Sequence, residues 1–174
     1  LLVGEAYYEL AADPAGESLV DRVRAGDNLV VARTFSKIYG LAGMRVGYAL
    51  ARPDIIARMR PWSMSVGGNT GGLAAAIASY PDSAFLAYSR GRILEAREMI
   101  EAAAKSAGLP VLKSATNFVF VKVPDADAVQ KRLEAKGILI RGPYGKWTQW
   151  SRVSCGRIED VARYAAALPA AARA

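Results

Sequence analysis

Three short apolar runs in the first fifty residues constrain the fold of this chain more than any other feature. They are Leu1–Val3, Asn28–Ala32 and Val46–Leu50, and their apolar residues are nearly continuous rather than alternating with polar ones. This pattern is typical of strands that are buried on both faces of a sheet covered by helices. The sequence therefore predicts an α/β fold with these runs in one sheet.

Three predicted helices follow the apolar runs. Pro53 begins a short helix, and Leu73–Ser79 is a helix of small residues after a glycine-rich connection at 65–72. Pro81 begins the longest helical pattern, which ends near Gly108, a residue type suited to a helix C-terminus. A helix of roughly 25 residues is about 37 Å long. It is long enough to link two domains.

The rest of the chain alternates predicted strands and helices. Strands are expected at Asn117–Val123, Ile138–Ile140 and Arg152–Gly156, and helices at Asp125–Gly137 and Ile158–Leu168. The first of these strands alternates cleanly between apolar and other residues, which predicts a sheet with one buried face. No internal repeat is visible in the sequence.

Composition excludes several classes of protein. The chain has 174 residues, of which 52% are hydrophobic, so we expect a folded core rather than disorder. No apolar stretch approaches the about 20 residues that span a bilayer, so no membrane partner is expected. The single cysteine, Cys155, cannot form an internal disulfide, which fits a cytoplasmic location. Because the chain begins with Leu1 in what resembles the middle of a strand, we expect it to be the C-terminal part of a longer protein.

The absence of histidine narrows the possible chemistry. It excludes Ser/His/Asp and Cys/His catalysis and the usual zinc clusters, so no metal site is expected. A net charge of +7 suggests an acidic partner, but the positive residues are scattered, and the nearest candidate for a nucleic-acid surface is the basic and aromatic segment 141–152. A solvated surface explains the charge as well, so no nucleic-acid partner is expected.

Lys37 stands out because it lies between a predicted strand and a glycine-spaced segment, with Arg45 as the only other charge in 34–48. The hydroxyls of Thr34 and Ser36 and the guanidinium of Arg45 are donors suited to a phosphate. A lysine amine in an apolar setting is suited to Schiff-base formation. The glycines fit neither a dinucleotide-binding nor a P-loop pattern. On spacing alone, an ordinary turn that carries a surface lysine remains the simpler explanation.

A family resemblance changes that balance. The stretch "RTFSKIYGLAGMRVGYAL" resembles the Schiff-base segment of pyridoxal-phosphate-dependent aminotransferases of fold type I, and most closely the histidinol-phosphate aminotransferase group. The segments "EAYYEL", "SATNFVFV", "GILIR" and "SRVSCGRIED" resemble further motifs of this family, in the same order. The resemblance therefore covers essentially the whole chain and corresponds to roughly the C-terminal half of such an enzyme.

The resemblance implies an α/β fold in two parts. Residues 1–82 would hold the last strands of the large cofactor-binding sheet domain, and residues 83–174 a long linking helix and a smaller α/β domain. The implied activity is amino transfer between a histidinol-phosphate-like donor and 2-oxoglutarate, with pyridoxal 5'-phosphate as cofactor. The implied partners are an amino acid or phosphorylated amino alcohol, a 2-oxo acid and, in the full-length form, a second copy in a homodimer.

Functional residues follow from the same resemblance. Lys37 is implied to bind the cofactor as a Schiff base and to move a proton at the substrate α-carbon. The implied cofactor-binding residues besides Lys37 are Ser36, Arg45 and Thr34, which hold the phosphate, and Tyr7, which donates to the phenolic oxygen.

Two arginines are implied to contact the substrate. Arg152 would pair with the substrate carboxylate through both sides of its planar guanidinium. Arg141 is a second candidate, although a solvated arginine at a strand end explains it equally well. Tyr7 and Arg152 also have structural explanations, as a tyrosine at the edge of the core and a surface arginine.

The resemblance breaks at Gly4, where the family has an aspartate that pairs with the ring nitrogen of the cofactor. Glu5 is adjacent, but successive side chains of a strand point to opposite faces. The earlier half of the family's pocket is also absent. We therefore expect the 174-residue chain alone to bind the cofactor weakly and not to transfer amino groups. A degenerate interaction module, a phosphothreonine decarboxylase-like enzyme and an aromatic aminotransferase stay open as alternatives.

Overall fold

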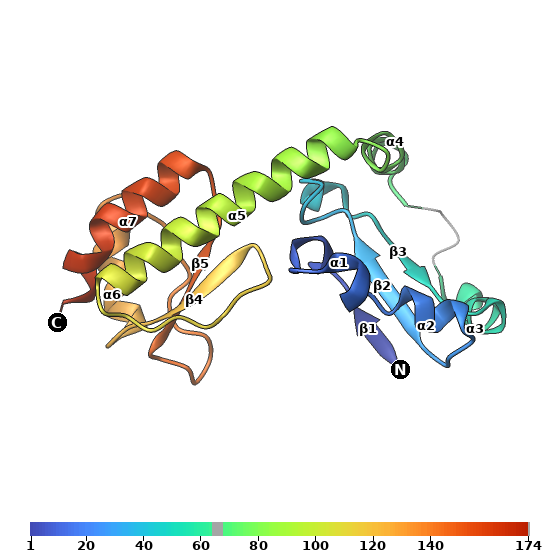
Figure 1. Ribbon diagram of the computed structural model, residues 1–174, viewed down its shortest axis with the longest axis horizontal. Coiled ribbons are helices and arrows are strands. Elements are labelled where there is room, and N and C mark those ends of the chain that lie inside the picture. Colours follow the sequence, from blue (N-terminus) through green and yellow to red (C-terminus); the bar gives the residue numbers. More distant parts are fainter. Residues whose placement is uncertain (64–67, 174) are drawn as a thin grey trace. The chain divides into compact units, whose positions relative to one another are not determined.

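The computed structural model describes residues 1–63 and 68–173, and they form two compact units (Figure 1). The first unit is Leu1–Ser89 and the second is Arg90–Ala174. Helix α5 (Ser83–Ser106) contributes residues to both units. Its 24 residues confirm the predicted long helix. The assignment of a cofactor-binding domain to 1–82 and a small domain to 83–174 stays a prediction.

A three-stranded sheet forms the centre of the first unit. Its strands are β1 (Leu2–Gly4), β2 (Val30–Thr34) and β3 (Gly47–Leu50), in the order β1-β2-β3. The pair β1 and β2 is parallel, and the pair β2 and β3 is antiparallel. All three predicted strands are therefore present, with β2 beginning two residues later than expected because Val30 is the first residue in register with β1.

Short helices lie between these strands and between β3 and α5. They are η1 (Tyr8–Leu10), α1 (Pro14–Glu17), α2 (Val20–Arg24), η2 (Ala42–Met44), α3 (Pro53–Met59), η3 (Arg60–Trp62) and α4 (Thr70–Ser79). Pro53 is the first residue of α3, as predicted, because a helix start needs no N–H from that residue. The helix expected at Leu73–Ser79 begins earlier, at Thr70. Part of the glycine-rich connection at 65–72 lies outside the described residues.

The prediction that these strands are buried on both faces is wrong for the described chain. Val31 is fully buried, whereas Leu2 is 71% exposed and Gly4 and Ala49 are also exposed. Register places Leu2, Gly4 and Ala49 on one face, because paired residues of neighbouring strands share a face. A Cβ on Gly4 would meet no atom within 4 Å, so the face is open at that position.

A single hydrophobic core holds the second unit together. The two-stranded antiparallel sheet of β4 (Phe118–Lys122) and β5 (Trp150–Ser154) packs with α6 (Ala126–Glu134), α7 (Ile158–Ala172) and the C-terminal part of α5. The inward residues of β4 are Val119 and Val121, both fully buried. This confirms the alternation predicted for that strand.

Capping residues explain where the helices of this unit begin and end. The Asp125 side chain accepts hydrogen bonds from the N–H groups of Asp127 and Ala128, which satisfies the first turn of α6. Gly108 follows α5 with a φ of 70°, a left-handed conformation that glycine adopts without steric cost. Both positions agree with the sequence-based expectation.

Two elements of the second unit differ from their predictions. Residues 138–140 form no strand. Pairing with β5 is limited to the next residue, Arg141, which forms an isolated bridge to Arg152. Helix α7 continues four residues beyond the predicted end at Leu168 and contains Pro169. Burial of Leu168 and Ala171, at 0% and 2% exposure, offsets the hydrogen bond that Pro169 cannot donate.

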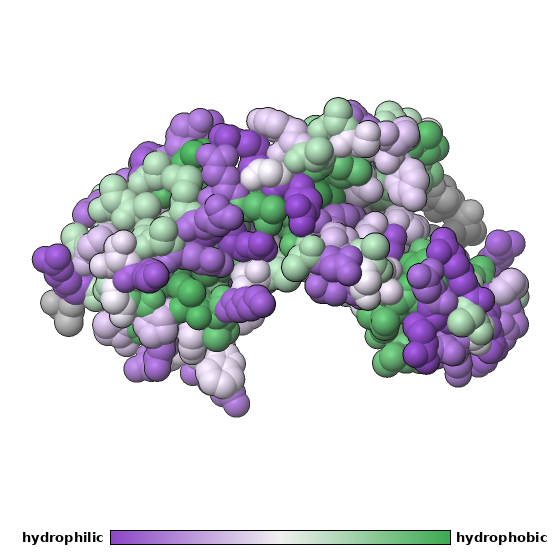
Figure 2. All heavy atoms as spheres, in the orientation of Figure 1, coloured by the Kyte–Doolittle hydropathy of each residue, from purple (hydrophilic) through white to green (hydrophobic). Residues whose placement is uncertain are grey.

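Hydrophilic residues are spread over the visible face of the second unit, with apolar residues between them (Figure 2). This distribution agrees with the scattered charges of the sequence. Within 1–63 and 68–173, no helix is both long and apolar enough to cross a membrane, and no cluster of acidic or cysteine side chains has the geometry of a metal site.

Candidate active site

The turn after β2 positions Lys37. Phe35, Ile38 and Tyr39 are buried on either side of it and anchor the turn in the core of the first unit. The Phe35 N–H donates to the carbonyl of Val46 at 3.0 Å, and the Phe35 carbonyl accepts from Leu41 N–H at 3.0 Å. The apolar anchors therefore fix the backbone on both sides of Lys37.

Tyr7 lies beside Lys37. The Lys37 Nζ is 5.1 Å from the centre of the Tyr7 ring, within the range of a cation–π contact. Tyr7 follows β1 and Lys37 follows β2, and β1 and β2 are neighbouring parallel strands. The carboxyl ends of such strands lie at one edge of the sheet, which is where α/β folds bind ligands. Among the described residues, Lys37 forms no ion pair with a carboxylate.

Ser36, Arg45 and Thr34 form a group of polar side chains around the same turn. The Arg45 Nη1 donates to the Ser36 Oγ at 3.3 Å and to the Ala42 carbonyl at 2.7 Å. The Thr34 Oγ1 accepts from the Ser36 N–H at 3.0 Å and donates to the Val46 carbonyl at 3.4 Å. A guanidinium next to two hydroxyls is a donor set suited to a phosphate group.

Backbone conformation at Arg45 is unusual. Its φ is 55° and its ψ is 45°, and it is the only described residue other than glycine with a positive φ. A side chain in this region costs roughly 1–2 kcal/mol. The cost is tolerated here because the conformation directs the guanidinium towards Ser36 and Ala42.

Two glycines near this turn lie very close to backbone carbonyl groups of other residues. A Cβ placed on Gly47 would lie 2.7 Å from the Arg33 carbonyl oxygen, which is closer than real Cβ contacts. A Cβ on Gly72 would lie 2.9 Å from the Met44 carbonyl oxygen. Only glycine allows these approaches. The glycine spacing noted in the sequence therefore serves the packing of the turn.

Glu5 does not replace the aspartate that the family has at position 4. Its carboxylate accepts from Arg33 Nε and Nη2 at 3.0 and 2.9 Å, from the Leu19 N–H at 2.6 Å and from the Ser18 hydroxyl. Its side chain is only 6% exposed. A Cβ on Gly4, by contrast, would meet no atom within 4 Å. Position 4 therefore presents an open space without a carboxylate.

Arg141 and Arg152 come together in the second unit. The Cζ of Arg141 is 5.3 Å and the Cζ of Arg152 is 5.9 Å from the centre of the same Tyr144 ring. The Cζ of Arg152 is also 4.7 Å from the centre of the Phe118 ring. Neither arginine forms an ion pair with a described carboxylate, and the buried Nε of Arg152 has no hydrogen-bond partner there. The two guanidinium groups thus lie at the same aromatic ring without an ion pair to a described carboxylate.

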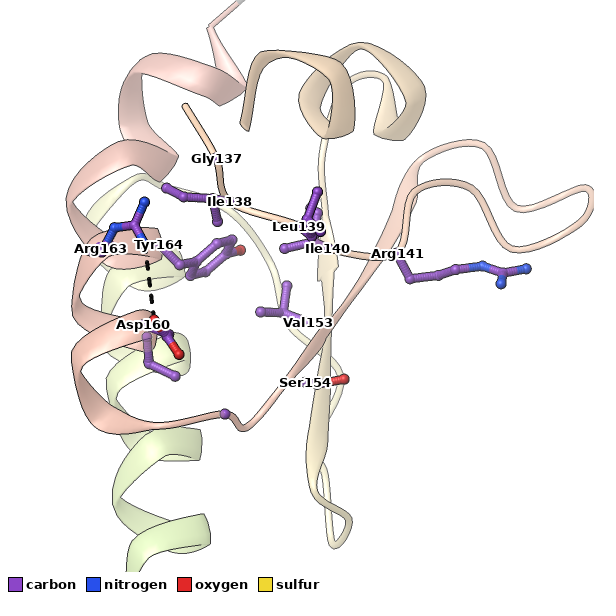
Figure 3. A pocket seen from close by; sticks show the side chains of 12 residues that line it. Gly137, Ile138, Leu139, Ile140, Arg141, Val153, Ser154, Asp160, Arg163 and Tyr164 are labelled. Carbon is purple, nitrogen blue, oxygen red and sulfur yellow. Dashed lines mark ion pairs between the residues drawn. The ribbon is translucent and has the colours of Figure 1, made fainter. Parts of the chain in front are cut away.

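A cavity of about 550 Å³ lies in the same unit, lined by residues between Gly137 and Tyr164 (Figure 3). Arg141 is at the end of the lining segment, and its side chain extends away from the cavity. Asp160 and Arg163 form an ion pair at the cavity, at 4.0 Å. The Arg141 guanidinium therefore points away from this cavity, and Arg152 is not among the residues that line it.

Burial changes the acidity of two further groups. It raises the pKa of the Cys155 thiol to about 11, so this thiol is protonated at neutral pH and is a poor nucleophile. Burial also raises the pKa of Tyr39 to about 12, with a further contribution from the negative charge of Glu9. Neither group is suited to acid–base work near pH 7.

The structure fits the aldehyde and phosphate ends of pyridoxal phosphate. Lys37 supplies an amine next to an aromatic ring, and Ser36 with Arg45 supplies donors for a phosphate. Position 4 offers no acid for the ring nitrogen.

Sequence reasoning missed two features of the site. One is the network of Arg33 with Glu5, in which the Cζ of Arg33 also lies 3.7 Å from the centre of the Tyr8 ring. The other is the row of aromatic rings around Arg152. Alternating phenylalanines in β4 were the available signal for the row. The Glu5–Arg33 pairing had no local signal, since it joins residues 28 positions apart.

Comparison with known proteins gives a consistent picture. The model of the aminotransferase class I and II family matches residues 1–168. The chain is 36% identical to histidinol-phosphate aminotransferase 1 of Cupriavidus pinatubonensis over 174 residues, covering 97% of this chain and 46% of the relative. It is also 36% identical to histidinol-phosphate aminotransferase 1 of Dechloromonas aromatica, covering 97% of this chain and 47% of that protein. The chain thus spans about half the length of the curated relatives it matches.

Solved structures agree with these relatives. The histidinol-phosphate aminotransferase of Sinorhizobium meliloti, solved in complex with pyridoxal-5'-phosphate, superposes with a TM-score of 0.89 at 35% identity, covering 99% of this chain and 48% of that one. The L-threonine-O-3-phosphate decarboxylase of Porphyromonas gingivalis has a TM-score of 0.80 at 22% identity, with 97% and 54% covered. The latter likeness concerns the fold alone.

Proposed function

Because this chain belongs to the class I and II aminotransferase family, we propose that it forms part of a pyridoxal-phosphate-dependent enzyme that transfers amino groups. The proposed amino donor resembles histidinol phosphate, and the proposed acceptor is 2-oxoglutarate. Relatives that are 36% identical over nearly the whole chain support the donor. We further propose that the full-length protein is a cytoplasmic homodimer, as the resemblance implies.

The observation that carries this proposal is the arrangement around Lys37. Its amine lies next to the Tyr7 ring. In the same turn, the Arg45 guanidinium donates a hydrogen bond to the Ser36 hydroxyl. Bound pyridoxal phosphate would supply an aldehyde that reacts with amines and a ring that accepts electrons from the substrate. The chain must supply an amine, a phosphate-binding group and an anchor for the substrate.

Lys37 performs the covalent and proton-transfer work in this proposal. Its amine would be the group that holds the cofactor covalently. The same amine would take and return the proton at the substrate α-carbon. Tyr7 would donate a hydrogen bond from its hydroxyl to the phenolic oxygen of the cofactor.

Arg45, Ser36 and Thr34 anchor the phosphate. The Arg45 guanidinium carries the charge, and its contacts with Ser36 Oγ and the Ala42 carbonyl hold it in one position. Thr34 fixes the Ser36 backbone through the Ser36 N–H. Fixed donors lose little entropy when the anion binds.

Arg152 and Arg141 bind the anionic group of the substrate. Contacts with the Phe118 and Tyr144 rings hold the planar faces of these guanidinium groups, leaving their N–H edges for an anion.

A second candidate function is cofactor binding with little or no amino transfer. The open space at Gly4 and the engagement of Glu5 with Arg33 favour it, because the ring nitrogen then has no acidic partner to keep it protonated. Such a chain would still attach the cofactor through Lys37.

An assay of glutamate formation tests the proposed function. Protein containing this chain is incubated with pyridoxal phosphate, histidinol phosphate and 2-oxoglutarate. We expect glutamate to form, and we expect Lys37→Ala to abolish its formation. Lys113→Ala, which removes an exposed lysine of the second unit, is the control and should retain the rate. Equal rates for both variants would contradict the proposal, and cofactor attachment without glutamate would favour the second candidate.

A further inference from the structure

The net positive charge of the chain belongs entirely to the second unit. Residues 1–89 hold eight lysines and arginines against eight aspartates and glutamates, whereas residues 90–174 hold fifteen against eight. The first unit is therefore formally neutral, and the second carries the whole charge of +7. A unit with this charge attracts polyanions such as nucleic acid.

Two segments of the second unit contain no acidic residue, and they form its sheet. They are 102–124, which contains β4, and 135–158, which contains β5. Three of their lysines are exposed and form no ion pair with a described carboxylate: Lys113, Lys122 and Lys146. Asp125, the first acid after β4, uses its carboxylate to cap α6. The sheet therefore offers cations without competing acids.

Aromatic side chains lie on the outer face of the same sheet. Val119 and Val121 of β4 are fully buried, so Phe120 and Lys122, which alternate with them, point outward. Register pairs Lys122 directly with Trp150 of β5, so the lysine and the indole are neighbours on this face. Positive charge and aromatic surface thus occur side by side.

A slot of about 420 Å³ lies on this surface, lined by Leu112, Phe120, Tyr144, Trp147 and Trp150. Its volume is within the range of small-molecule sites. Trp147 is 57% and Tyr144 is 42% exposed, so both rings present much of their surface to solvent. Such rings offer a stacking surface to another flat ring.

Each of the three lysines is next to a residue that lines the slot. The Lys146 Nζ is 5.3 Å from the centre of the Trp147 ring. Lys122 is the register partner of Trp150, and Lys113 follows Leu112 in the chain. An apolar slot with cations beside it suits a flat ring joined to phosphate groups, because the ring can enter while the phosphates stay outside.

We propose that this slot, called here the aromatic slot, binds an unpaired base of single-stranded nucleic acid whose phosphates contact Lys113, Lys122 and Lys146. Aromatic stacking combined with a basic surface is the usual means of binding a single strand. A duplex keeps its bases stacked on one another, so it can offer this surface only its phosphates.

The proposal also explains the basic and aromatic segment 141–152. On the sequence alone, the expectation of no nucleic-acid partner depends on charges that are spread along the chain, and the fold brings several of them together on one sheet. The inference goes beyond the proposed function, because it uses neither the cofactor nor Lys37.

The experiment is fluorescence anisotropy of the chain with a labelled oligothymidylate of about 15 nucleotides, a length of the order of one single-strand binding site. A duplex of the same length is the comparison. We expect the single strand to bind at least about tenfold more tightly than the duplex, because only its bases can stack. Unlabelled thymidine monophosphate should compete at least about a hundredfold more weakly than the unlabelled strand, since it offers a single phosphate. Oligouridylate is the RNA arm: the strand that binds more tightly identifies RNA or DNA as the ligand, and binding of either supports the aromatic slot.

Two variants separate stacking from charge. Trp147→Ala should weaken the single strand about tenfold without changing the dependence of affinity on salt, because a stacking surface is lost. Trp147→Phe, which keeps a ring, should lose less. Lys146→Gln should reduce the slope of log affinity against log salt by about 0.7, because one phosphate contact is lost.

Matched controls come from the same chain. Trp62→Ala removes a tryptophan that is 90% exposed in the first unit, and Lys131→Gln removes an exposed lysine of α6 that pairs with Asp127. Both should leave the affinity and its salt dependence unchanged. The aromatic slot is overturned by absence of single-strand binding at about 50 mM salt, where phosphate contacts are strong. Equal affinity for strand and duplex, unchanged affinity in Trp147→Ala, or equally tight binding of thymidine monophosphate would overturn it as well.

Discussion

Gly4 and Glu5 are neighbours in sequence with opposite environments. Glu5 is buried against Arg33, whereas Gly4 is exposed at the end of β1. Strand geometry requires this difference, because adjacent residues point to opposite faces. The carboxylate of Glu5 therefore stabilises the fold of the first unit, and the open face at Gly4 is left without an acid.

Replacing Glu5 by Gln tests its structural role. Arg33, whose side chain is only 13% exposed, would then lose its ion pair with Glu5. We expect the free energy of unfolding to fall by about 3 kcal/mol or more, measured by urea denaturation. Asp21→Asn is the matched control, because the pair of Asp21 and Arg24 is exposed and should contribute less than about 1 kcal/mol. Similar losses in the two variants would show that the buried pair has no special role.

Introducing the missing acid tests the importance of Gly4. A Cβ there meets no atom within 4 Å, so Gly4→Asp should fold with unchanged stability. A charged hydrogen bond to the ring nitrogen contributes roughly 1.5–3 kcal/mol, so we expect affinity for pyridoxal phosphate to rise about tenfold or more in equilibrium dialysis. Gly91→Asp adds the same charge at an exposed position of α5 and should have no effect. An unchanged affinity in Gly4→Asp would contradict the importance of the acid.

At the scale of elements, the turn after β2 combines strain and function. Arg45 has a left-handed backbone that glycine would adopt more easily. Ser36 and Lys37 are held on the same turn by the buried residues Phe35 and Ile38. Strain that persists in such a turn is common where a side chain must take one position.

Arg45→Gly separates these two effects. We expect stability to be unchanged or higher by about 1 kcal/mol, because the strained conformation suits glycine. Affinity for pyridoxal phosphate should fall about tenfold or more, since a charged donor to the phosphate is lost. Affinity for pyridoxal, which lacks the phosphate, should not change. Equal losses for both ligands would show that Arg45 acts on the fold rather than on the phosphate.

Local patterns predicted most elements of the fold. Apolar runs predicted β1, β2 and β3, and capping residues predicted the limits of α5 and the start of α6. The segment 138–140 was predicted as a strand because it is apolar, but only Arg141 finds a partner in β5. Pairing between distant segments decides such cases, and it cannot be inferred from local composition.

The candidate site was predicted unevenly for the same reason. Lys37, Ser36 and Arg45 belong to one short motif, so a sequence resemblance is enough to find them. The row of aromatic rings around Arg152 depends on the register of Phe120 with Arg152, residues from two separate strands. Long-range register of this kind becomes visible only in the structure.

At the scale of the whole molecule, buried tyrosines make the stability depend on pH. Burial raises the pKa of Tyr39 from its ordinary value of 10.0 to about 12, and it also raises the pKa values of Tyr8 and Tyr164. Between these two values the folded chain binds more protons than the unfolded chain, so the free energy of unfolding decreases as the pH rises. The contribution is complete below pH 10 and is lost as the pH approaches 12.

Urea denaturation at several alkaline pH values tests this dependence. We expect the midpoint to fall steadily above pH 10, and we expect a smaller fall in Tyr39→Phe. Tyr88→Phe changes a tyrosine that is 66% exposed and should follow the unmodified chain. A fall of equal size in Tyr39→Phe would show that this buried phenol does not contribute.

The central claim for the whole molecule is that Lys37 attaches pyridoxal phosphate. Lys37 is the only lysine among the first 89 residues. The most direct test is reduction of the chain with borohydride in the presence of the cofactor, followed by peptide mass mapping. The proposed function predicts that the pyridoxyl group is found on Lys37 and is absent from Lys37→Ala. Labelling spread over the exposed lysines of the second unit, with Lys37 unmodified, would contradict it.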